Sequence, residues 1–252
     1  EGLVGLARGA DAAHLNGDSD LDILVSQLVH PDWRGFAHSS PTLAYVSSLD
    51  GNNRLNYRPT VLKLRFDETP TNGTVADFNG DGYPDIVWNS MYHVPRLHLG
   101  GPNESWIDVS EEAGLVGVGG EGIAWSDFDN DGRIDLAWED AERGLRLLKN
   151  VGPKKPWIAV RLNSKTGISV GATVKIESIN RTQWISGGNG QGQQNSATLL
   201  LHLPSSTGVN AEILPLASNQ WIKTELKPGV LNLVDIKSKP PISTAKENRQ
   251  LR

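Results

Sequence analysis

Short apolar segments alternate with turns rich in Gly, Asn and Asp along most of this 252-residue chain. Segments such as 73–76 (Gly-Thr-Val-Ala) and 86–88 (Ile-Val-Trp) have the composition and length of strands, and few apolar stretches follow a helical period. Turn clusters such as Leu-Asp-Gly-Asn-Asn at 49–53, together with 27 Gly and 14 Pro, separate them. The pattern predicts an all-β chain. One short helix is expected at 109–114, where a serine precedes two glutamates and a glycine ends the segment.

A nine-residue polar motif interrupts the apolar segments at two places. It reads Asp-Phe-Asn-Gly-Asp-Gly-Tyr-Pro-Asp over residues 77–85 and Asp-Phe-Asp-Asn-Asp-Gly-Arg-Ile-Asp over residues 127–135. Because strand-like segments flank the motif, we expect each copy to be a loop that joins two strands.

Both copies place oxygen-bearing side chains at positions 1, 3, 5 and 9 and a glycine at position 6. Ca²⁺ takes about six to eight oxygen ligands, and the glycine allows the sharp turn that brings alternate side chains to one point. The EF-hand glutamate at position 12 is replaced by Trp88 and Trp138, so these are not EF-hands. The predicted calcium ligands are Asp77, Asn79, Asp81, Tyr83 and Asp85 in one loop and Asp127, Asp129, Asp131, Arg133 and Asp135 in the other, with Tyr83 and Arg133 contributing backbone carbonyls.

A weaker copy of the motif lies at residues 14–22. His14 replaces the first aspartate and Ser19 replaces the glycine, and imidazole suits transition metals better than calcium. The candidate ligands of a third, weaker calcium site are Asn16, Asp18, Asp20 and Asp22. For all three loops, and most of all for this one, the alternative is an ordinary turn held by bonds from side chains to the backbone.

The three loops begin 63 and then 50 residues apart, which indicates one supersecondary unit per repeat, stacked or arranged radially. They resemble FG-GAP/VCBS repeats, the blade units of integrin-type β-propellers. The resemblance implies that each acidic loop binds Ca²⁺ between two blade strands. A closed propeller needs at least about four blades, so we expect a partial or open propeller-like arrangement. Its open strand edges would be covered by the rest of the chain or by another protein.

The segments at 157–162, 167–176 and 187–196 resemble the ASPIC/UnbV domain. This domain follows such repeats in the cartilage acidic protein family and in its bacterial relatives. The resemblance implies a small β-sandwich or barrel-like domain after the blades. Two runs that are usual in that domain, Phe-Gly-Leu-Gly and Trp-Pro-Ser-Gly, are missing from 201–206 and 212–217.

The charge of the chain changes sign near residue 150, between the repeats and the ASPIC/UnbV-like segments. Residues 1–150 hold 24 acidic and 11 basic side chains, whereas residues 151–252 hold 5 acidic and 13 basic ones. The segment at 150–156 contains the Pro and Gly that are typical of a linker. We therefore expect calcium-loop repeats over 1–150, an ASPIC/UnbV-like domain over 151–237 and a flexible basic tail over 238–252. Clustered carboxylates repel one another, so the repeats should need calcium for stability.

Several classes of function are disfavoured. The chain has no cysteine, and its six histidines show no recognisable metal-binding spacing. The Ser-Gly-Gly-Asn-Gly run at 186–190 lacks the context of a hydrolase nucleophile and the ending of a phosphate loop. Basic residues are scattered and not interleaved with aromatic residues, which disfavours nucleic-acid binding. We therefore expect a protein without catalytic activity of its own.

The expected function is a calcium-stabilised interaction module that scaffolds protein–protein contacts. It would act as an accessory subunit of a larger assembly, such as a membrane-bound complex, or as an adhesin. Weak calcium loops suit compartments with millimolar calcium, so a periplasmic or extracellular location is expected, with the export signal not visible in this sequence. Two alternatives are a carbohydrate-binding module that stacks sugars on Trp88, Trp125 or Trp138, and an accessory domain of a larger enzyme. The simpler interpretation of these tryptophans is packing beneath the loops.

Overall fold

The computed structural model describes residues 7–15, 21–27, 43–49, 55–61, 70–90, 93–163, 170–188, 194–216 and 218–236. These residues form strands β1 to β18 and two short 3-10 turns, η2 (Pro102–Glu104) and η3 (Glu177–Ile179). The described residues contain no α-helix. The predicted all-β class is therefore confirmed.

Strands β1 to β11 form three antiparallel sheets in which neighbours in the sequence pair with each other. Blade one contains β1 (Ala7–Ala13), β2 (Asp22–Gln27), β3 (Leu43–Leu49) and β4 (Leu55–Val61). Blade two contains β5 (Pro70–Ala76), β6 (Asp85–Ser90), β7 (Arg96–Gly101) and β8 (Ser105–Asp108). Blade three contains β9 (Gly119–Ser126), β10 (Asp135–Asp140) and β11 (Gly144–Leu148). Each blade is thus a meander that one repeat can form by itself.

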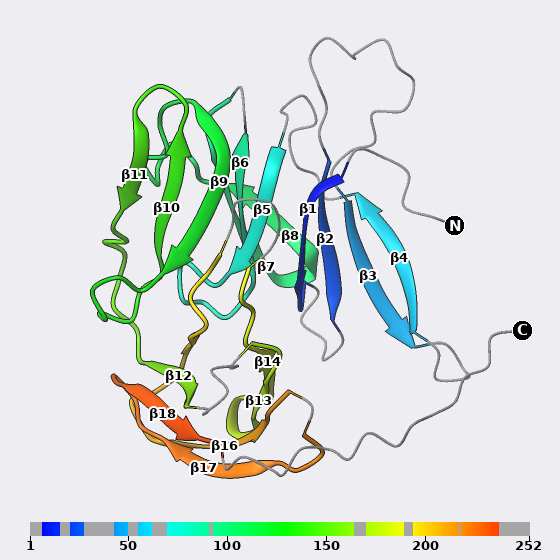
Figure 1. The fold of residues 1–252 in the computed structure, drawn as a ribbon, viewed down its shortest axis with the longest axis vertical. Helices are drawn as coiled ribbons and strands as arrows, with labels where there is room; N and C mark the ends of the chain where they lie inside the picture. The colour runs from blue at the N-terminus through cyan, green and yellow to red at the C-terminus, as the bar shows by residue number, and fades with distance from the viewer. Residues whose placement is uncertain are drawn as a thin grey trace, which may run out of the picture.

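The blades pack against one another through their first strands. Strand β5 contacts β1 and β2 on one side and β9 on the other. Blade three can come this close because residue 119 is glycine: a Cβ atom there would overlap Asn89 Oδ1. The three sheets stand side by side in an open arc (Figure 1), and the described strands form no closed propeller.

Strands β12 to β18 form a small two-sheet sandwich. One sheet has the order β15-β12-β18, with β12 parallel to β18, and the other has the order β14-β13-β16-β17. Their bounds are β12 (Trp157–Asn163), β13 (Thr173–Ile176), β14 (Arg181–Trp184), β15 (Leu199–His202), β16 (Val209–Leu214), β17 (Ile222–Leu226) and β18 (Leu231–Asp235). Apolar side chains from both sheets share one core. The sandwich lies below the blades in Figure 1.

Two strands of the sandwich are buried on both faces. On β12, Ile158 and Val160 point into the sandwich core, whereas Ala159 packs with residues of blades two and three. On β15, Leu201 points into the sandwich core and Leu200 packs against the blades. Successive side chains of a strand point to opposite faces, so a continuous apolar run is what such a strand requires. These strands join the sandwich to the blades through a shared apolar contact.

The predicted helix at 109–114 is wrong. The segment is a hydrogen-bonded turn between β8 and β9, in which Ala113 N donates to Val109 O at 2.8 Å and Gly114 N donates to Glu111 O at 2.9 Å. Gly114 adopts a left-handed φ of 76°, so the helical pattern cannot continue. A single turn gains too few hydrogen bonds to persist as a helix. The predicted tail at 238–252 lies outside the described residues.

Candidate metal sites in the acidic loops of the blades

Each acidic loop connects the first and second strands of its blade. Loop one (14–22) joins β1 to β2, loop two (77–85) joins β5 to β6, and loop three (127–135) joins β9 to β10. The predicted strand–loop–strand unit is therefore confirmed in all three repeats. The loops occupy equivalent places at one end of neighbouring sheets.

The last aspartate of each loop is buried and holds two other segments of its blade. One carboxylate oxygen accepts a hydrogen bond from the backbone N–H of the second loop residue, and the other accepts one from the third strand or the residues that follow it. The N···O distances are 2.7 Å from Leu15 and 2.8 Å from Ser47 to Asp22, 2.7 Å from Phe78 and 2.9 Å from Gly100 to Asp85, and 2.9 Å from Phe128 and 2.7 Å from Asn150 to Asp135. This position is structural in all three blades, and loop one keeps it as Asp22 although its positions 1 and 6 differ from those of the other two loops.

Loop three brings three carboxylates together. Oxygen atoms of Asp127, Asp129 and Asp135 all lie within 4.8 Å of one another. The two oxygens of Asp127 also accept hydrogen bonds from Asp131 N and Gly132 N, at 3.0 and 2.9 Å. Burial raises the pKa of Asp127, and these backbone hydrogen bonds oppose that effect. Such a set of hard oxygen donors suits a divalent cation such as Ca²⁺.

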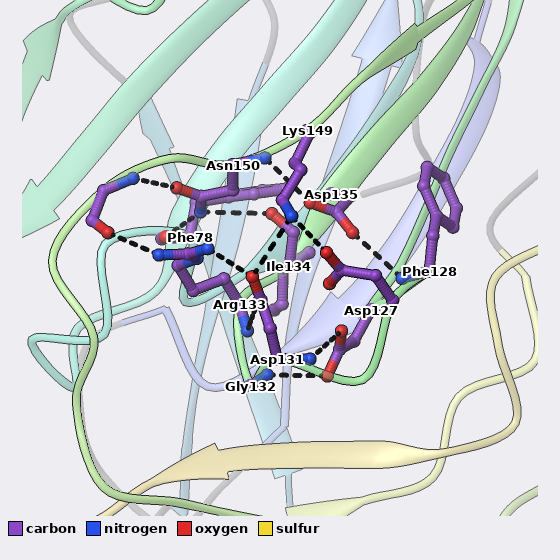
Figure 2. A network of polar contacts seen from close by, with 12 residues as sticks. Phe78, Asp127, Phe128, Asp131, Gly132, Arg133, Ile134, Asp135, Lys149 and Asn150 are labelled. Carbon is purple, nitrogen blue, oxygen red and sulfur yellow. Dashed lines mark hydrogen bonds and ion pairs between the residues drawn. The ribbon is translucent and has the colours of Figure 1, made fainter.

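Two basic side chains lie beside loop three (Figure 2). Lys149 forms an ion pair with Asp129, and its Nζ atom lies 3.7 Å from Asp131 Oδ2. The hydrogen bond from Lys149 lowers the pKa of Asp129 and raises that of Lys149. Arg133 pairs with Asp131 and also donates to Gly152 O at 2.9 Å. Both cations would compete with a metal ion for the same carboxylates.

Loop two offers a different set of oxygen atoms. Asp77 Oδ2 accepts a hydrogen bond from Gly82 N at 3.0 Å, whereas Asp77 Oδ1 is buried and accepts none from the described residues. A buried carboxylate oxygen without a partner is costly, and a bound cation would satisfy it. Asn79 Nδ2 donates to Asp81 Oδ2 at 2.9 Å, so positions 3 and 5 lie within reach of each other. The residues present therefore fit a hard cation, with one carboxylate fewer than in loop three.

The remaining predicted ligands are only partly described. Tyr83 N and Arg133 N donate to the side chains of Asp81 and Asp131, at 2.8 and 3.1 Å, and the role of their carbonyl groups stays a prediction. In loop one only Asp22 of the predicted ligands is described. The other three, Asn16, Asp18 and Asp20, lie outside the described residues.

The backbone of loops two and three is left-handed at two positions. The glycines at position 6 have φ values of 93° (Gly82) and 87° (Gly132), as the turn argument predicts. Position 4 is also left-handed, with φ of 70° at Gly80 and 58° at Asn130. Glycine and asparagine are the residues that tolerate this conformation best. The sequence analysis did not identify position 4, although its Gly and Asn are the signal that could have done so.

The sandwich contacts loops two and three directly. His202 on β15 lies between them, with Nδ1 3.4 Å from Asp77 Oδ2 and Nε2 3.0 Å from Gly132 O. Arg181 on β14 donates to Gly82 O, and the Trp157 ring lies where a Cβ atom at Gly132 would be. Sequence reasoning missed the contacts of these three residues with the loops because the residues lie outside the repeats, in a later part of the chain.

A buried polar network joins all three blades and the sandwich. The Thr74 hydroxyl lies at its centre, where it accepts hydrogen bonds at 3.1 Å from both Trp125 Nε1 and Asn195 Nδ2. Thr74 Oγ1 also lies 3.4 Å from Asp11 Oδ2, which accepts a hydrogen bond from Val75 N at 2.8 Å. Burial raises the pKa of Asp11 to about 7 despite the hydrogen bonds that oppose this shift.

A cavity of about 380 Å³ lies next to this network, between the blades and the sandwich. Asp11 and Trp125 line it from the blade side, and Arg181, Trp184 and Asn195 line it from the sandwich side. Trp184 Nε1 donates to Ala12 O at 3.0 Å, which fixes the indole ring at the cavity wall. Trp88 and Trp138, by contrast, are buried in the blades, so the packing interpretation holds for them and sugar stacking on their rings is excluded.

Comparison with known protein families agrees with the repeat pattern. Residues 14–88 and 77–138 match the model of the FG-GAP-like repeat, and each match begins at the first residue of an acidic loop. Residues 14–138 are therefore similar to FG-GAP-like repeats. Loop one is thereby included in the repeat, although it diverges most. No curated protein matches the chain significantly.

FG-GAP-like repeats are typical of extracellular interaction modules and are generally not catalytic. The part of the chain that the structure describes contains no helix long and apolar enough to span a membrane.

The ion pair of Lys149 leads to a first prediction. The Lys149→Gln variant should bind calcium severalfold more tightly, because it removes a cation that competes for Asp129. Isothermal titration calorimetry at low salt measures this affinity. The matched control is Lys175→Gln, which removes an exposed lysine paired with Glu177 at 3.4 Å in the sandwich and should change nothing. Equal affinities for the wild type and Lys149→Gln would contradict competition at loop three.

The raised pKa of Asp11 leads to a second prediction. Native Asp11 keeps its proton up to about pH 7, whereas the unfolded chain releases it near the ordinary value of 3.8. Raising the pH from 4 to 7 should therefore destabilise the wild type through this group, and Asp11→Asn should remove that loss. Thermal unfolding across this range, in chelator, should show the Tm of Asp11→Asn rising relative to the wild type. The control Asp235→Asn, at an exposed position, should show the same change of Tm with pH as the wild type. The same change for Asp11→Asn would contradict the raised pKa of Asp11.

Proposed function

We propose that this chain is a non-catalytic interaction module whose blades are stabilised by calcium. The observation that carries the proposal is the convergence of Asp127, Asp129 and Asp135 in loop three. Three carboxylates so close together repel one another, and a divalent cation would relieve that repulsion. The predicted calcium ions are two, in loops two and three, with loop one as a weaker third site.

The donor types favour calcium over other metals. Carboxylate, amide and backbone carbonyl oxygens make up the predicted set in both loops, and hard cations prefer such oxygens. In loop two the buried Asp77 Oδ1 atom has no other partner among the described residues. In loop three the ion would take the place that the Lys149 ammonium holds beside Asp129.

Calcium would also support the joint between the blades and the sandwich. His202 contacts both loops, and Arg181 bonds to the backbone of loop two. A metal that orders the loops would therefore order the surface on which the sandwich docks, and linkage requires that docking strengthen metal binding in return. We propose that this sandwich corresponds to an ASPIC/UnbV-like domain, on the resemblance of its glycine-rich segment.

The proposed role is to hold protein partners in an extracytoplasmic compartment, periplasmic or extracellular. Calcium loops of low affinity suit a millimolar calcium supply. The acidic half and the basic half of the chain offer surfaces of opposite charge to other subunits, including those of a membrane complex. The carboxylates that could serve as catalytic acids are already used in the loops and in bonds to the blade backbone, which supports a non-catalytic role.

The calcium proposal is tested by Asp129→Asn. Asp129 is exposed and its side chain bonds to Lys149, so the apo fold should tolerate the change. When calcium stands about 100-fold above Kd it stabilises a site by about 2.7 kcal/mol. For a chain of this size that corresponds to roughly 5–10 °C in Tm. The Asp129→Asn variant should lose most of this calcium-dependent rise in Tm. In chelator its Tm should equal that of the wild type.

The matched control is Asp235→Asn, which removes an exposed aspartate that accepts one hydrogen bond from Asn163 at 2.6 Å. It should keep the full response to calcium. A wild-type Tm that does not respond to calcium would sink the proposal, as would an equal loss for Asp129→Asn with and without chelator.

A second candidate function is carbohydrate binding in the cavity between the blades and the sandwich. Its volume of about 380 Å³ lies within the usual range for small-ligand sites. Its walls combine two tryptophan rings, Trp125 and Trp184, with the carboxylate of Asp11, the amide of Asn195 and the guanidinium of Arg181. Flat apolar rings beside planar polar groups are suited to the apolar faces and hydroxyl groups of a sugar.

Calorimetric titration with a panel of mono- and disaccharides tests this candidate. Binding should be detected for the wild type and lost in Trp184→Ala. The variant Trp221→Ala removes an exposed tryptophan of the sandwich that lies outside the cavity lining, and it should bind normally. Binding that survives Trp184→Ala, or no binding of any sugar, would remove this candidate.

A further inference from the structure

Blades two and three have equivalent registers that are offset by 50 residues. Trp88 and Trp138 occupy equivalent places, and each pairs with an arginine of the strand that follows. Equivalent residues of the two blades can therefore be compared directly. The two acidic loops differ at position 3, where loop two has Asn79 and loop three has Asp129. This amide is the reason that loop two has one carboxylate fewer.

Asn79 is followed by Gly80, and this pair of residues favours loss of the side-chain amide. A glycine has no side chain to shield its backbone nitrogen, so that nitrogen can reach the Cγ atom of the asparagine. Gly80 N donates no hydrogen bond to any described residue. The left-handed φ of 70° favours glycine at this position, and a Cβ atom there would lie 3.0 Å from the His202 ring. The turn and the nearby sandwich thus both favour this Asn-Gly pair.

Asp81 holds both ends of the Asn79 amide. Its backbone N–H donates to Asn79 Oδ1 at 2.8 Å, and its Oδ2 atom accepts a hydrogen bond from Asn79 Nδ2 at 2.9 Å. The carboxylate of Asp81 is itself fixed by a hydrogen bond from Tyr83 N at 2.8 Å. An N–H group at Oδ1 stabilises the negative charge that forms on this oxygen when Cγ is attacked. The carboxylate beside Nδ2 stabilises the positive charge of the leaving group as this nitrogen takes up a proton.

We propose that Asn79 is a site of spontaneous deamidation, which supplies loop two with the aspartate that loop three has at position 3. The Gly80 nitrogen gives up its proton to water and attacks Asn79 Cγ, and the bond from Cγ to Nδ2 breaks to release ammonia. Water then attacks Cγ of the cyclic imide, and the bond from Cγ to the Gly80 nitrogen breaks. This step leaves an aspartate at position 79 and restores the N–H group of Gly80. Water is consumed and ammonia is released, so the reaction needs no oxidant or reductant.

The cyclic imide can also open at its other carbonyl carbon, which belongs to the backbone. Water attack there gives isoaspartate and lengthens the loop backbone by one carbon atom. The N–H group of Asp81 bonds to the oxygen on Cγ in the folded loop and draws electrons from that carbon. The folded chain should therefore form a larger share of aspartate than the unfolded chain does.

Another Asn-Gly pair, Asn72-Gly73 in β5, provides a comparison within the same chain. Asn72 is 2% exposed, and its Nδ2 atom donates to Glu121 O at 2.6 Å. Both residues of this pair are held in register with β6. Asn79, by contrast, is half-buried in a loop between two strands. Asn72 should therefore stay intact in the folded chain. The Asn-Gly pairs at 16–17 and 189–190 lie outside the described residues.

The conversion of Asn79 matters for the metal, because the number of charged ligands sets the affinity of a calcium loop. In loop three Lys149 forms an ion pair with Asp129 and competes for its carboxylate. The equivalent place in blade two is occupied by Leu99. A new carboxylate at position 79 therefore meets a leucine in place of a competing lysine. This consequence rests on the proposed calcium function, whereas the deamidation itself does not.

Peptide mapping of the full chain by mass spectrometry tests the proposal. One sample is kept folded in mildly alkaline buffer with chelator, and another is kept in urea. Asn79 should convert in both samples, with a larger share of aspartate in the folded one, whereas Asn72 should convert only in urea. Fragment ions assign each conversion to its residue, and chromatography separates aspartate from isoaspartate. An Asn79 that stays intact in the folded chain, or that gives only isoaspartate there, would overturn the proposal.

The Asn79→Asp variant tests the consequence for calcium. Calorimetric titration should show severalfold tighter calcium binding than in the wild type, because the loop gains a charged ligand. The matched control is Asn210→Asp, which adds the same charge at an exposed position on β16 and should leave the affinity unchanged. An unchanged affinity for Asn79→Asp would overturn the calcium consequence alone, since the peptide map decides the modification by itself. A wild type that binds no calcium would count against the proposed function.

Discussion

A buried carboxylate at the start of each second strand is the interaction on which the blades depend. Asp22, Asp85 and Asp135 each hold an N–H group of the loop and an N–H group of the third strand or its end. Burying a carboxylate is unfavourable, and burial raises the pKa of Asp85 to about 7 although the hydrogen bonds act against it. The bonds offset this cost and satisfy backbone donors that would otherwise have no partner where the loop turns into the strand.

The acidic loops have two structural tasks, to gather oxygen ligands and to present a surface to the sandwich. The two tasks use the same residues: Asp77 contributes one oxygen to the candidate ion site, and its other oxygen lies near His202. Gly82 and Gly132 allow the left-handed turns and also leave room for Arg181 and Trp157. A substitution at Asp77, Gly82 or Gly132 would therefore disturb the metal site and the joint with the sandwich together.

The sandwich is joined to the blades by apolar as well as polar contacts. Strand β12 and strand β15 alternate between two cores, so neither side of the joint can be removed without exposing apolar surface. The polar network around Thr74 lies beside this contact and links the first strands of all three blades to Asn195. The chain therefore acts as one unit, even though its charge and its repeats divide it in two. On the far face of blade three, Leu145 and Leu147 are exposed.

The sequence by itself determined the local features: the all-β class, the strand–loop–strand units, the left-handed glycines at position 6 and the aspartates that converge in loop three. These depend on the side-chain period of a strand and on the dihedral angles of a turn, which a short stretch of residues encodes. The prediction of a helix at 109–114 failed because the local sequence favours only one hydrogen-bonded turn there. The left-handed Gly114 ends that turn before a helix can form.

Only the tertiary structure decided the structural role of the aspartate at loop position 9 and the position of Lys149 beside Asp129. It also decided the contact of His202 with two loops and the exposure of Leu147 at a position where its counterpart Leu97 is buried. Each of these depends on segments that meet in space from distant parts of the chain, and identical local patterns can end in opposite surroundings.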